Sequence, residues 1–379
     1  MTTHEQRAAE GWRVFEATGF PPDDPPPPLP APPPWRRFHG SPVQPAPPED
    51  EAAALRRLGP GDTIPQLGPD EIDIVNAALV LRRPLLVTGP PGIGKSSLAY
   101  LLSRELGLGR VLEWNIVSRT VLRDGLYTHD AMGRAQAIAA WQAGLGVGTL
   151  PPAAGADNGA HGDAEGGTGA GGDRPGEGRA PRPANRQKPP ALDGFITLGP
   201  LGTALLPYER PRVLLIDELD KSDIDLPNDL LHVLENGSYE IPELVRAAAT
   251  RARVHSADPG GRAEVHDGRV ECREFPVVLI TSNGEREFPA AFRRRCLPLE
   301  MRPPTREQLL AIVERHLTMR PEGTEALVDL FVQRVQGGGT HALDQLLNAV
   351  QLTTAGGFQA DGDGRKLVEL LLRDLAKGR

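Results

Sequence analysis

One glycine-rich stretch constrains the fold of this chain more than any other feature of its sequence. The stretch reads GPPGIGKSS and satisfies the spacing G-x-x-x-x-G-K-[ST] through Gly89, Gly94, Lys95 and Ser96. An apolar run, LLVT, comes before it, and the helical pattern SLAYLLSREL overlaps its end. We therefore predict a buried strand, a tight loop and a helix, with backbone N–H groups of the loop arranged around an anion.

Nucleotide phosphates are the anions that this spacing suits. The Lys95 ammonium is placed for the β- and γ-phosphates, and the Ser96 hydroxyl for a Mg²⁺ ion. The predicted cofactors are therefore a nucleotide and Mg²⁺. The predicted binding residues form one continuous run: Gly89, Pro90, Pro91, Gly92, Ile93, Gly94, Lys95, Ser96 and Ser97.

Two further apolar runs end in polar side chains that suit phosphate chemistry. RVLLIDE places Asp217 and Glu218 at the carboxyl end of a predicted strand, where ligands bind in α/β sheets. Asp217 is suited to hold Mg²⁺ through water, and Glu218 to polarise an attacking water as a general base. FPVVLITSN places Asn283 where it can orient that water. The alternatives are helix-start acids without a catalytic role and an asparagine that caps a turn before Gly284.

The order of these runs predicts the fold class. Apolar strands alternate with helical patterns from residue 61 to 302, which indicates a parallel α/β sheet. From residue 303 to 379 only helical patterns remain, among them TREQLLAIVERHL and HALDQLLNAVQLT, which indicates a small all-α domain. We predict a P-loop parallel sheet followed by a helical lid.

Two segments are predicted to lack packed structure. Residues 1–60 include PPDDPPPPLPAPPP, in which ten of fourteen residues are proline, and such a tract favours a stiff tether or an SH3-type ligand. The WRRF stretch that follows can pin the tether to a folded surface through its two aromatics.

Residues 143–192 are predicted to be a disordered insertion. Between 151 and 190 no large apolar residue occurs, and 17 of 40 residues are Gly or Pro, so burial cannot offset the entropy of ordering.

Composition limits the partners and the location of the chain. Its formal charge of -8 lacks the overall basic field that supports nucleic-acid binding, which disfavours nucleic acid as a partner. The two cysteines, Cys272 and Cys296, exclude a disulfide framework and suit a reducing compartment. No apolar run approaches the ~20 residues that span a bilayer, and the first residues lack an apolar signal segment. We expect a cytoplasmic protein without a membrane span.

Together these motifs resemble those of the AAA+ ATPases, and they are most similar to the MoxR-like branch. The resemblance rests on GPPGIGKSSLA, LLIDELDKSDIDLPNDLLHVLENG and AFRRRC, and it covers Gly68 to Leu347 without the insertion. It implies a five-stranded P-loop sheet with a helical lid, ATP rather than GTP at the seam between them, and usually a hexameric homo-oligomer. It also implies that Glu218 activates water and that Asn283 is the residue called sensor 1. In this family the partner is often a protein with a von Willebrand A-type domain.

The chain departs from the family at one position of the lid. An arginine, sensor 2, is expected where GGGTHALDQLL has His341. Histidine is shorter and only partly charged at pH 7, so it either contacts a phosphate weakly or follows Thr340 as a helix cap, which we favour.

The resemblance also suggests a β-hairpin insertion over residues 238–274. SYEIPELVR and GRVECREF are its predicted strands and HSADPGGRAEVHDG a mobile tip, which either contacts a substrate or is plain surface.

The stretch PAAFRRRCLPL carries Arg293, Arg294 and Arg295 in a row. Successive residues of a helix point about 100° apart, so the three cannot all face one phosphate. The resemblance assigns Arg295, with Arg294 beside it, to the finger that contacts the ATP of an adjacent subunit, and leaves Arg293 as a bystander. A structural salt bridge and a nucleic-acid patch are the alternatives, and nearby glutamates dilute such a patch.

Three functions fit this set of motifs. The first is an ATP-hydrolysing, ring-forming chaperone or remodeller of a partner protein. The second is a nucleic-acid-linked NTPase of a restriction or defence system. The third is a nucleotide-dependent switch or scaffold with little hydrolysis, which is suggested by His341 at the expected arginine position.

Overall fold

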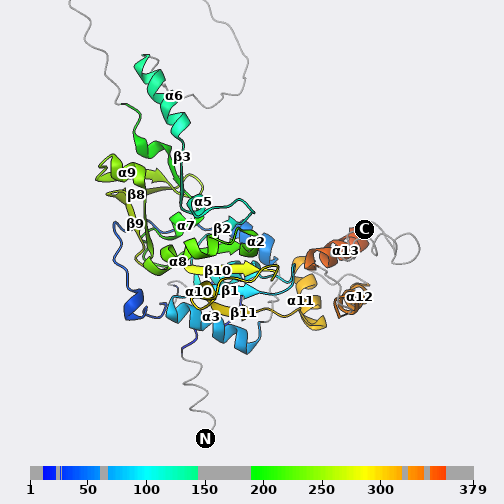
Figure 1. Ribbon diagram of the computed structural model, residues 1–379. Coiled ribbons are helices and arrows are strands. Elements are labelled where there is room, and N and C mark those ends of the chain that lie inside the picture. The colour runs from blue at the N-terminus through cyan, green and yellow to red at the C-terminus, as the bar shows by residue number, and fades with distance from the viewer. Residues whose placement is uncertain are drawn as a thin grey trace, which may run out of the picture. The chain divides into compact units, whose positions relative to one another are not determined.

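Five parallel strands form the central sheet of the computed structural model, which describes residues 12–22, 26, 28–59, 67–143, 189–317, 323–336 and 342–355. The strands pair in the order β11-β1-β10-β5-β2, and every pair is parallel (Figure 1). Their bounds are β1 (Leu85–Thr88), β2 (Leu112–Asn115), β5 (Val213–Asp217), β10 (Val277–Ser282) and β11 (Leu297–Glu300). This sheet confirms the predicted α/β fold class.

Helices cover the central sheet because its inner strands are almost completely buried. Every residue of β10 and all of β5 except Asp217 are buried, as expected of strands covered on both faces. Alternate residues of β1, β5 and β10 pack with α2, α3 and α4 in one hydrophobic cluster, and α7 contacts β2 and β5. The helices and short turns around this sheet are α2 (Glu51–Leu58), α3 (Pro69–Leu81), α4 (Ser97–Leu106), α5 (Leu122–Leu126), α7 (Pro200–Ala204), η3 (Leu219–Lys221), α8 (Leu226–Asn236) and α10 (Ala290–Arg293).

A second sheet holds the segment that was predicted to be a hairpin insertion. Six strands pair in the order β3-β4-β7-β8-β9-β6, and α9 (Pro242–Arg246) follows β6. The prediction of a mobile tip at HSADPGGRAEVHDG is wrong, because part of this stretch is β8, which pairs antiparallel with β7. Alternate small apolar side chains on β7 and β8 are buried, which explains the pairing. The bounds are β3 (Tyr127–His129), β4 (Ile196–Leu198), β6 (Ser238–Glu240), β7 (Arg251–His255), β8 (Arg262–His266) and β9 (Arg269–Glu271).

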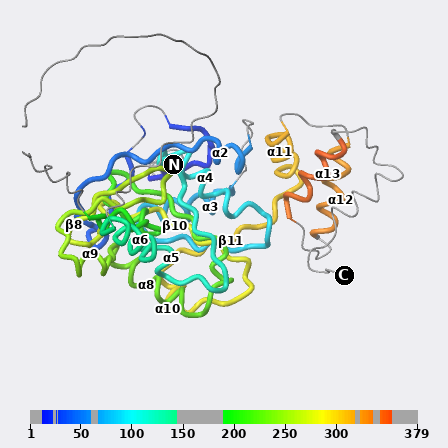
Figure 2. Tube along the Cα trace, turned by 90° about the horizontal axis from the view of Figure 1, so that it is seen from above, coloured from blue at the N-terminus to red at the C-terminus, as the bar shows by residue number. Residues whose placement is uncertain are grey.

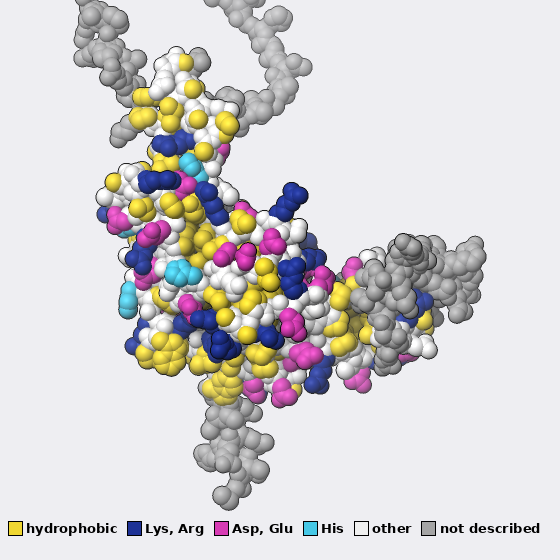
Figure 3. Space-filling model, viewed as in Figure 1, with side chains coloured by type: hydrophobic (Ala, Val, Ile, Leu, Met, Phe, Trp, Pro, Cys, Tyr) yellow, Lys and Arg dark blue, Asp and Glu magenta, His cyan; other side chains and the backbone are white. Residues whose placement is uncertain are grey.

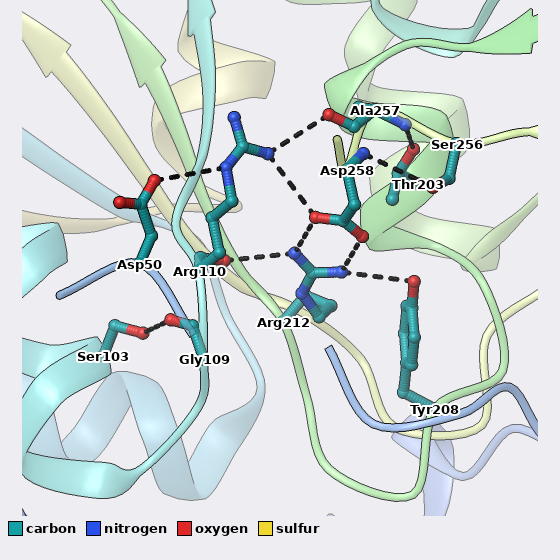
Figure 4. Close-up of polar contacts among 10 residues, drawn as sticks. All are labelled: Asp50, Ser103, Gly109, Arg110, Thr203, Tyr208, Arg212, Ser256, Ala257 and Asp258. Carbon is teal, nitrogen blue, oxygen red and sulfur yellow. Dashed lines mark hydrogen bonds and ion pairs between the residues drawn. The ribbon is translucent and has the colours of Figure 1, made fainter. Parts of the chain in front are cut away.

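A buried ion pair fastens the turn between β7 and β8 to the central sheet. Arg212, whose side chain is fully buried just before β5, donates to both carboxylate oxygens of Asp258 at 2.8 and 2.9 Å. Arg110 lies 3.4 Å from the same Asp258 carboxylate oxygen, Oδ1, that accepts from Arg212, and 3.5 Å from a carboxylate oxygen of Asp50 (Figure 4). Four charged side chains thus join segments that are far apart in the sequence. Loss of Asp258 would leave the buried Arg212 guanidinium without its carboxylate partner.

The helices after β11 build a hydrophobic cluster of their own. They are α11 (Arg306–Leu317), α12 (Thr324–Gln336) and α13 (Leu343–Ala355), and each buries an apolar stripe that includes Val313, Val328 or Leu346. This arrangement follows from apolar residues at helical spacing.

A separate compact unit, residues 129–195, contains α6 (Ala131–Gln142) and η2 (Leu192–Phe195). Most of the predicted insertion, residues 144–188, lies outside the described residues.

The N-terminal segment differs from the prediction of an unpacked tether. Its described residues between 12 and 59, here called the strap, run along the α/β unit and are blue in Figures 1 and 2. Phe15 is fully buried in the main cluster, and the Asn76 side chain exchanges hydrogen bonds with the backbone of Phe15 at 3.0 and 2.7 Å. The Glu105 carboxylate accepts from the backbone N–H groups of Glu16 and Gly19. The strap has no core of its own, but it contributes side chains to the core of the sheet.

The WRRF stretch pins the strap as predicted, but through one aromatic only. Phe38 stacks on Phe275 with ring centroids 6.0 Å apart, and the Arg36 guanidinium lies 4.7 Å from the centre of the same Phe275 ring. Trp35, in the short helix η1 (Pro34–Arg36), is 76% exposed. The structure therefore assigns the anchoring to Phe38 and Arg36.

Replacement of Phe15 by alanine tests the packing of the strap. We expect Phe15→Ala to lower the free energy of unfolding by about 3–5 kcal/mol, because it leaves a cavity in the main cluster. Urea unfolding of the full chain measures the loss. The matched control is Trp35→Ala, which removes an exposed aromatic of the same segment and should change stability by about 0.5 kcal/mol or less. Equal unfolding midpoints for the two variants would contradict a packed strap.

Candidate functional site

The loop between β1 and α4 has three glycines with positive φ, Gly89, Gly92 and Gly94, and two of them show different reasons for needing glycine. Gly94 has a φ of +93°, a region that favours glycine, although a Cβ there would meet nothing within 4 Å. Gly89 has a φ of +149°, and a Cβ there would lie 2.5 Å from the backbone oxygen of Met301. The first requirement is conformational and the second is also steric. Together they set the path of the loop between strand and helix.

Lys95 lies at the centre of the site. Its ammonium donates to the backbone oxygens of Gly89 and Pro90 and to the Asn283 side-chain oxygen, at 2.8, 2.7 and 2.8 Å. The residue is only 6% exposed, and burial lowers the pKa of Lys95, while Asp217 and other nearby acids act in the opposite direction. The structure thus brings together the predicted lysine and the predicted Asn283, which lie on different strand ends.

Asp217 joins the loop to two strands of the sheet. One of its carboxylate oxygens accepts from the Ser96 hydroxyl at 2.7 Å and from the Thr281 hydroxyl at 2.6 Å. The Thr281 hydroxyl in turn accepts from the backbone N–H of Glu218 at 2.8 Å. Thr281 was not predicted as a site residue. The only signal for it was a polar residue near the end of an otherwise apolar run.

Glu218 adopts an unusual backbone conformation for a residue with a side chain. Its φ is +59°, in the left-handed region, which costs roughly 1–2 kcal/mol for a residue other than glycine. Its carboxylate accepts from the Asn283 amide at 3.3 Å and pairs with Lys221. This conformation directs the side chain toward Asn283 while the backbone N–H stays bonded to Thr281. Such strain is typical of functional positions.

Asp220 positions the loop that carries Asn283. It is 3% exposed, and one carboxylate oxygen accepts from the backbone N–H groups of Asn283 and Glu285, at 2.9 and 3.1 Å. Sequence analysis did not single out Asp220, because it is one of several acids in ELDKSD. The buried position and the two hydrogen bonds to a distant loop distinguish it from its neighbours.

An open polar pocket contains these side chains and extends beyond the predicted residues. Lys95, Ser96, Asp217, Glu218 and Asn283 all line it. Among the lining residues that were not predicted, four have titratable or charged side chains: Arg56 and Arg57 from α2, His316 from α11 and Asp344 from α13. Burial lowers the pKa of His316, so its ring is neutral near pH 7.

A mostly apolar hollow adjoins the polar pocket, and five residues line both: Arg57, Gly94, Ser97, His316 and Leu343. Its walls include Leu58, Ile93, Leu101, Met301, Ile312 and Leu343. Apolar walls of this kind suit a flat, uncharged ring, whereas the polar pocket suits an anion. A nucleotide offers both, so the two spaces are chemically matched to one ligand.

The groups that would hold Mg²⁺ and phosphates fit those ligands. Ser96 and Asp217 present oxygen atoms 2.7 Å apart, and hydroxyl and carboxylate oxygens are the ligands that Mg²⁺ prefers. The buried Lys95 ammonium offers a positive charge between the loop and Asn283. The residue set is therefore suited to a Mg²⁺–nucleotide complex.

Five predicted site residues that the structure describes do not line this pocket: Gly89, Pro90, Ile93, Arg294 and Arg295. Arg295 pairs with Glu235 of α8 and donates to the backbone oxygen of Ala291 at 3.1 Å, and Arg294 is exposed. Neither lines the pocket, and their assignment to an adjacent subunit stays a prediction. His341 lies outside the described residues.

No family model and no curated protein matches this chain. Solved structures similar to it include NtrX from Brucella abortus in complex with ADP, at 12% identity and a TM-score of 0.35, over 79% of this chain and 53% of that one. Two structures of Thermotoga maritima RuvB, one described as a Holliday junction branch migration motor, are each 14% identical, with TM-scores of 0.37 and 0.34. Each RuvB match covers 80% of this chain and 67% of that one. The chain thus spans about half the length of the NtrX structure.

Within the described residues, no helix has the length and apolar character needed to cross a bilayer.

Removal of the Thr281 hydroxyl tests the hydrogen-bonded centre of the site. We expect Thr281→Val to lower the free energy of unfolding by about 1–3 kcal/mol, because the Glu218 N–H would lose its acceptor. Urea unfolding checks this value. Thr281→Ser keeps the hydroxyl and serves as the control, with a smaller loss. If the valine variant were as stable as the serine variant, the hydroxyl would have no structural role.

Proposed function

We propose that this chain is a Mg²⁺-dependent ATPase of the AAA+ type. The observation that carries the proposal is the convergence of Lys95, Ser96, Asp217, Glu218 and Asn283 in one pocket at the carboxyl edge of the parallel sheet. These residues come from three separate motifs of the sequence. Their side chains have the chemical types that phosphoryl transfer to water needs: a cation, Mg²⁺ ligands, a base and an amide that orients water.

Each residue has a distinct role in this proposal. The loop N–H groups and Lys95 would bind phosphates, and Ser96 and Asp217 would hold Mg²⁺, which would neutralise phosphate charge. Glu218 would accept a proton from water, and Asn283, which would orient that water, also donates to the Glu218 carboxylate at 3.3 Å. Thr281 and Asp220 are positioning residues, because they contact the other side chains or the loop backbone of the site.

We further propose a MoxR-like chaperone that works as a ring and remodels a partner protein. The support is the sequence resemblance together with Arg294 and Arg295, which lie at the end of α10 and outside this chain's own pocket. A finger there would serve the nucleotide of an adjacent copy. A partner with a von Willebrand A-type domain and a cytoplasmic location remain part of this proposal.

A nucleic-acid-linked NTPase is the less favoured candidate. On the face shown in Figure 3, Lys and Arg side chains alternate with Asp and Glu rather than forming a continuous basic surface. The formal charge of -8 points the same way. Filter binding of DNA and RNA across a salt titration discriminates, because a salt-dependent affinity would favour this candidate. A switch with little hydrolysis would instead bind ATP and release no phosphate.

Replacement of Glu218 by glutamine tests the hydrolytic role. We expect Glu218→Gln to lower phosphate release about 10²-fold or more while ATP binding persists, because the amide cannot accept the proton from water. Phosphate release and calorimetric ATP titration provide the two measurements. Glu240→Gln, at an exposed carboxylate of β6, is the matched control and should leave turnover unchanged. Undiminished turnover in Glu218→Gln would overturn the assignment.

The arginines at the end of α10 provide a test of the ring. We expect specific activity to rise with protein concentration, and Arg295→Ala to lower it by ~10³-fold with ATP binding retained. Arg294→Ala tests the neighbouring finger residue, and Arg293→Ala should have little effect. Glu235→Gln removes the ion pair but leaves Arg295 in place, so it separates a finger from a salt bridge. If Glu235→Gln lost as much activity as Arg295→Ala, the salt bridge would explain the effect.

A further inference from the structure

The last turn of α2 carries two arginines that line the polar pocket, and only one of them is engaged. Arg57 pairs with Glu113 at 3.1 Å, and its guanidinium lies 5.7 Å from the centre of the Tyr100 ring. Arg56 is exposed, and its side chain has no hydrogen bond or ion pair with any residue that the structure describes. The strap thus brings an unpaired cation to the pocket.

Helix α2 is held against the loop side of the site. Leu58 is buried in the main cluster, and α2 packs against α4, the helix that follows the loop. The Ser97 hydroxyl, in the first turn of α4, donates to the backbone oxygen of Arg57 at 3.3 Å. The end of α2 that carries Arg56 therefore lies beside the start of α4, where the phosphate-binding loop ends.

The other end of α2 is held by the charged network of Figure 4. Asp50 caps the helix by accepting from the Ala53 N–H at 3.0 Å, and its carboxylate also lies near Arg110. The backbone N–H of Arg110 donates to Pro48 at 2.8 Å, and Arg110 reaches Asp258, which the buried Arg212 holds. Both ends of α2 are thus fastened to the α/β unit. Arg56 is carried by a fixed helix rather than by a loose tether.

We propose that Arg56 binds the phosphates of the nucleotide in its own subunit. The proposal rests on the proposed nucleotide-binding function. The pocket contains the acids Asp217, Glu218 and Asp344, so an unpaired cation in addition to Lys95 offsets their charge when a polyanion enters. Arginine suits this role because its planar guanidinium donates two parallel hydrogen bonds to phosphate oxygens.

The test compares nucleotide affinity among variants of the full chain. Calorimetric titration with Mg²⁺–ADP and Mg²⁺–ATP is expected to show about tenfold weaker binding for Arg56→Ala, because a charge-assisted contact is lost. Arg56→Lys should recover part of the loss. Arg246→Ala, an exposed arginine at the end of α9, is the control and should bind like the unmodified chain. Thermal unfolding without nucleotide checks that the variants are folded, with Arg56→Gln as the substitute if alanine perturbs α2.

The outcomes separate this inference from the proposed function. If the unmodified chain binds nucleotide and Arg56→Ala binds it equally well, Arg56 serves only the helix end and the inference is overturned. If the unmodified chain binds neither ADP nor ATP, the proposed function fails and the inference fails with it. Weaker binding in Arg56→Ala, with partial recovery in Arg56→Lys, supports a phosphate contact.

Discussion

The geometry of the site depends on the register in which β5 pairs with β10. Ile216 lies opposite Ile280, so the residues that follow them, Asp217 and Thr281, meet at the same edge and form a 2.6 Å hydrogen bond. A slip of one residue would turn the Thr281 hydroxyl to the other face of the sheet. Burial of both strands prevents such a slip, since it would move apolar side chains out of their packed positions. The geometry of the acids is therefore a product of core packing.

The first part of the chain, the strap, also supports the site through the hydrophobic core. It adds Phe15 and Leu58 to the hydrophobic cluster beneath the sheet and brings Arg56 and Arg57 to the pocket. Its cap residue, Asp50, belongs to the ion network that also holds the β7–β8 turn. The polar pocket, the strap and the second sheet are thus held in place by some of the same residues. A change in one of them has a physical route to the others.

The motifs of the site could be predicted because each one is local. A glycine-rich loop between an apolar run and a helix, or an acid after an apolar run, is recognisable within about ten residues. Thr281 and Asp220 were missed because their roles arise from partners more than 60 positions away along the chain. The strap was predicted to be unpacked for a related reason. Its composition supports no core of its own, and only contact with α3 and α4 gives Phe15 and Glu16 their partners.

The sequence by itself determined the strand, loop and helix around Lys95. It also determined the types of side chain in the proposed site, namely an acid pair and an asparagine that follow two buried strands. Backbone preference and apolar patterning act over a few residues, so a sequence contains enough information to predict them. Tertiary structure decided which side chains meet. It turned Arg295 toward Glu235, set Thr281 against Asp217 and delivered Arg56 to the pocket. Those contacts join distant segments, and they depend on the packing of the whole core rather than on any short stretch of sequence.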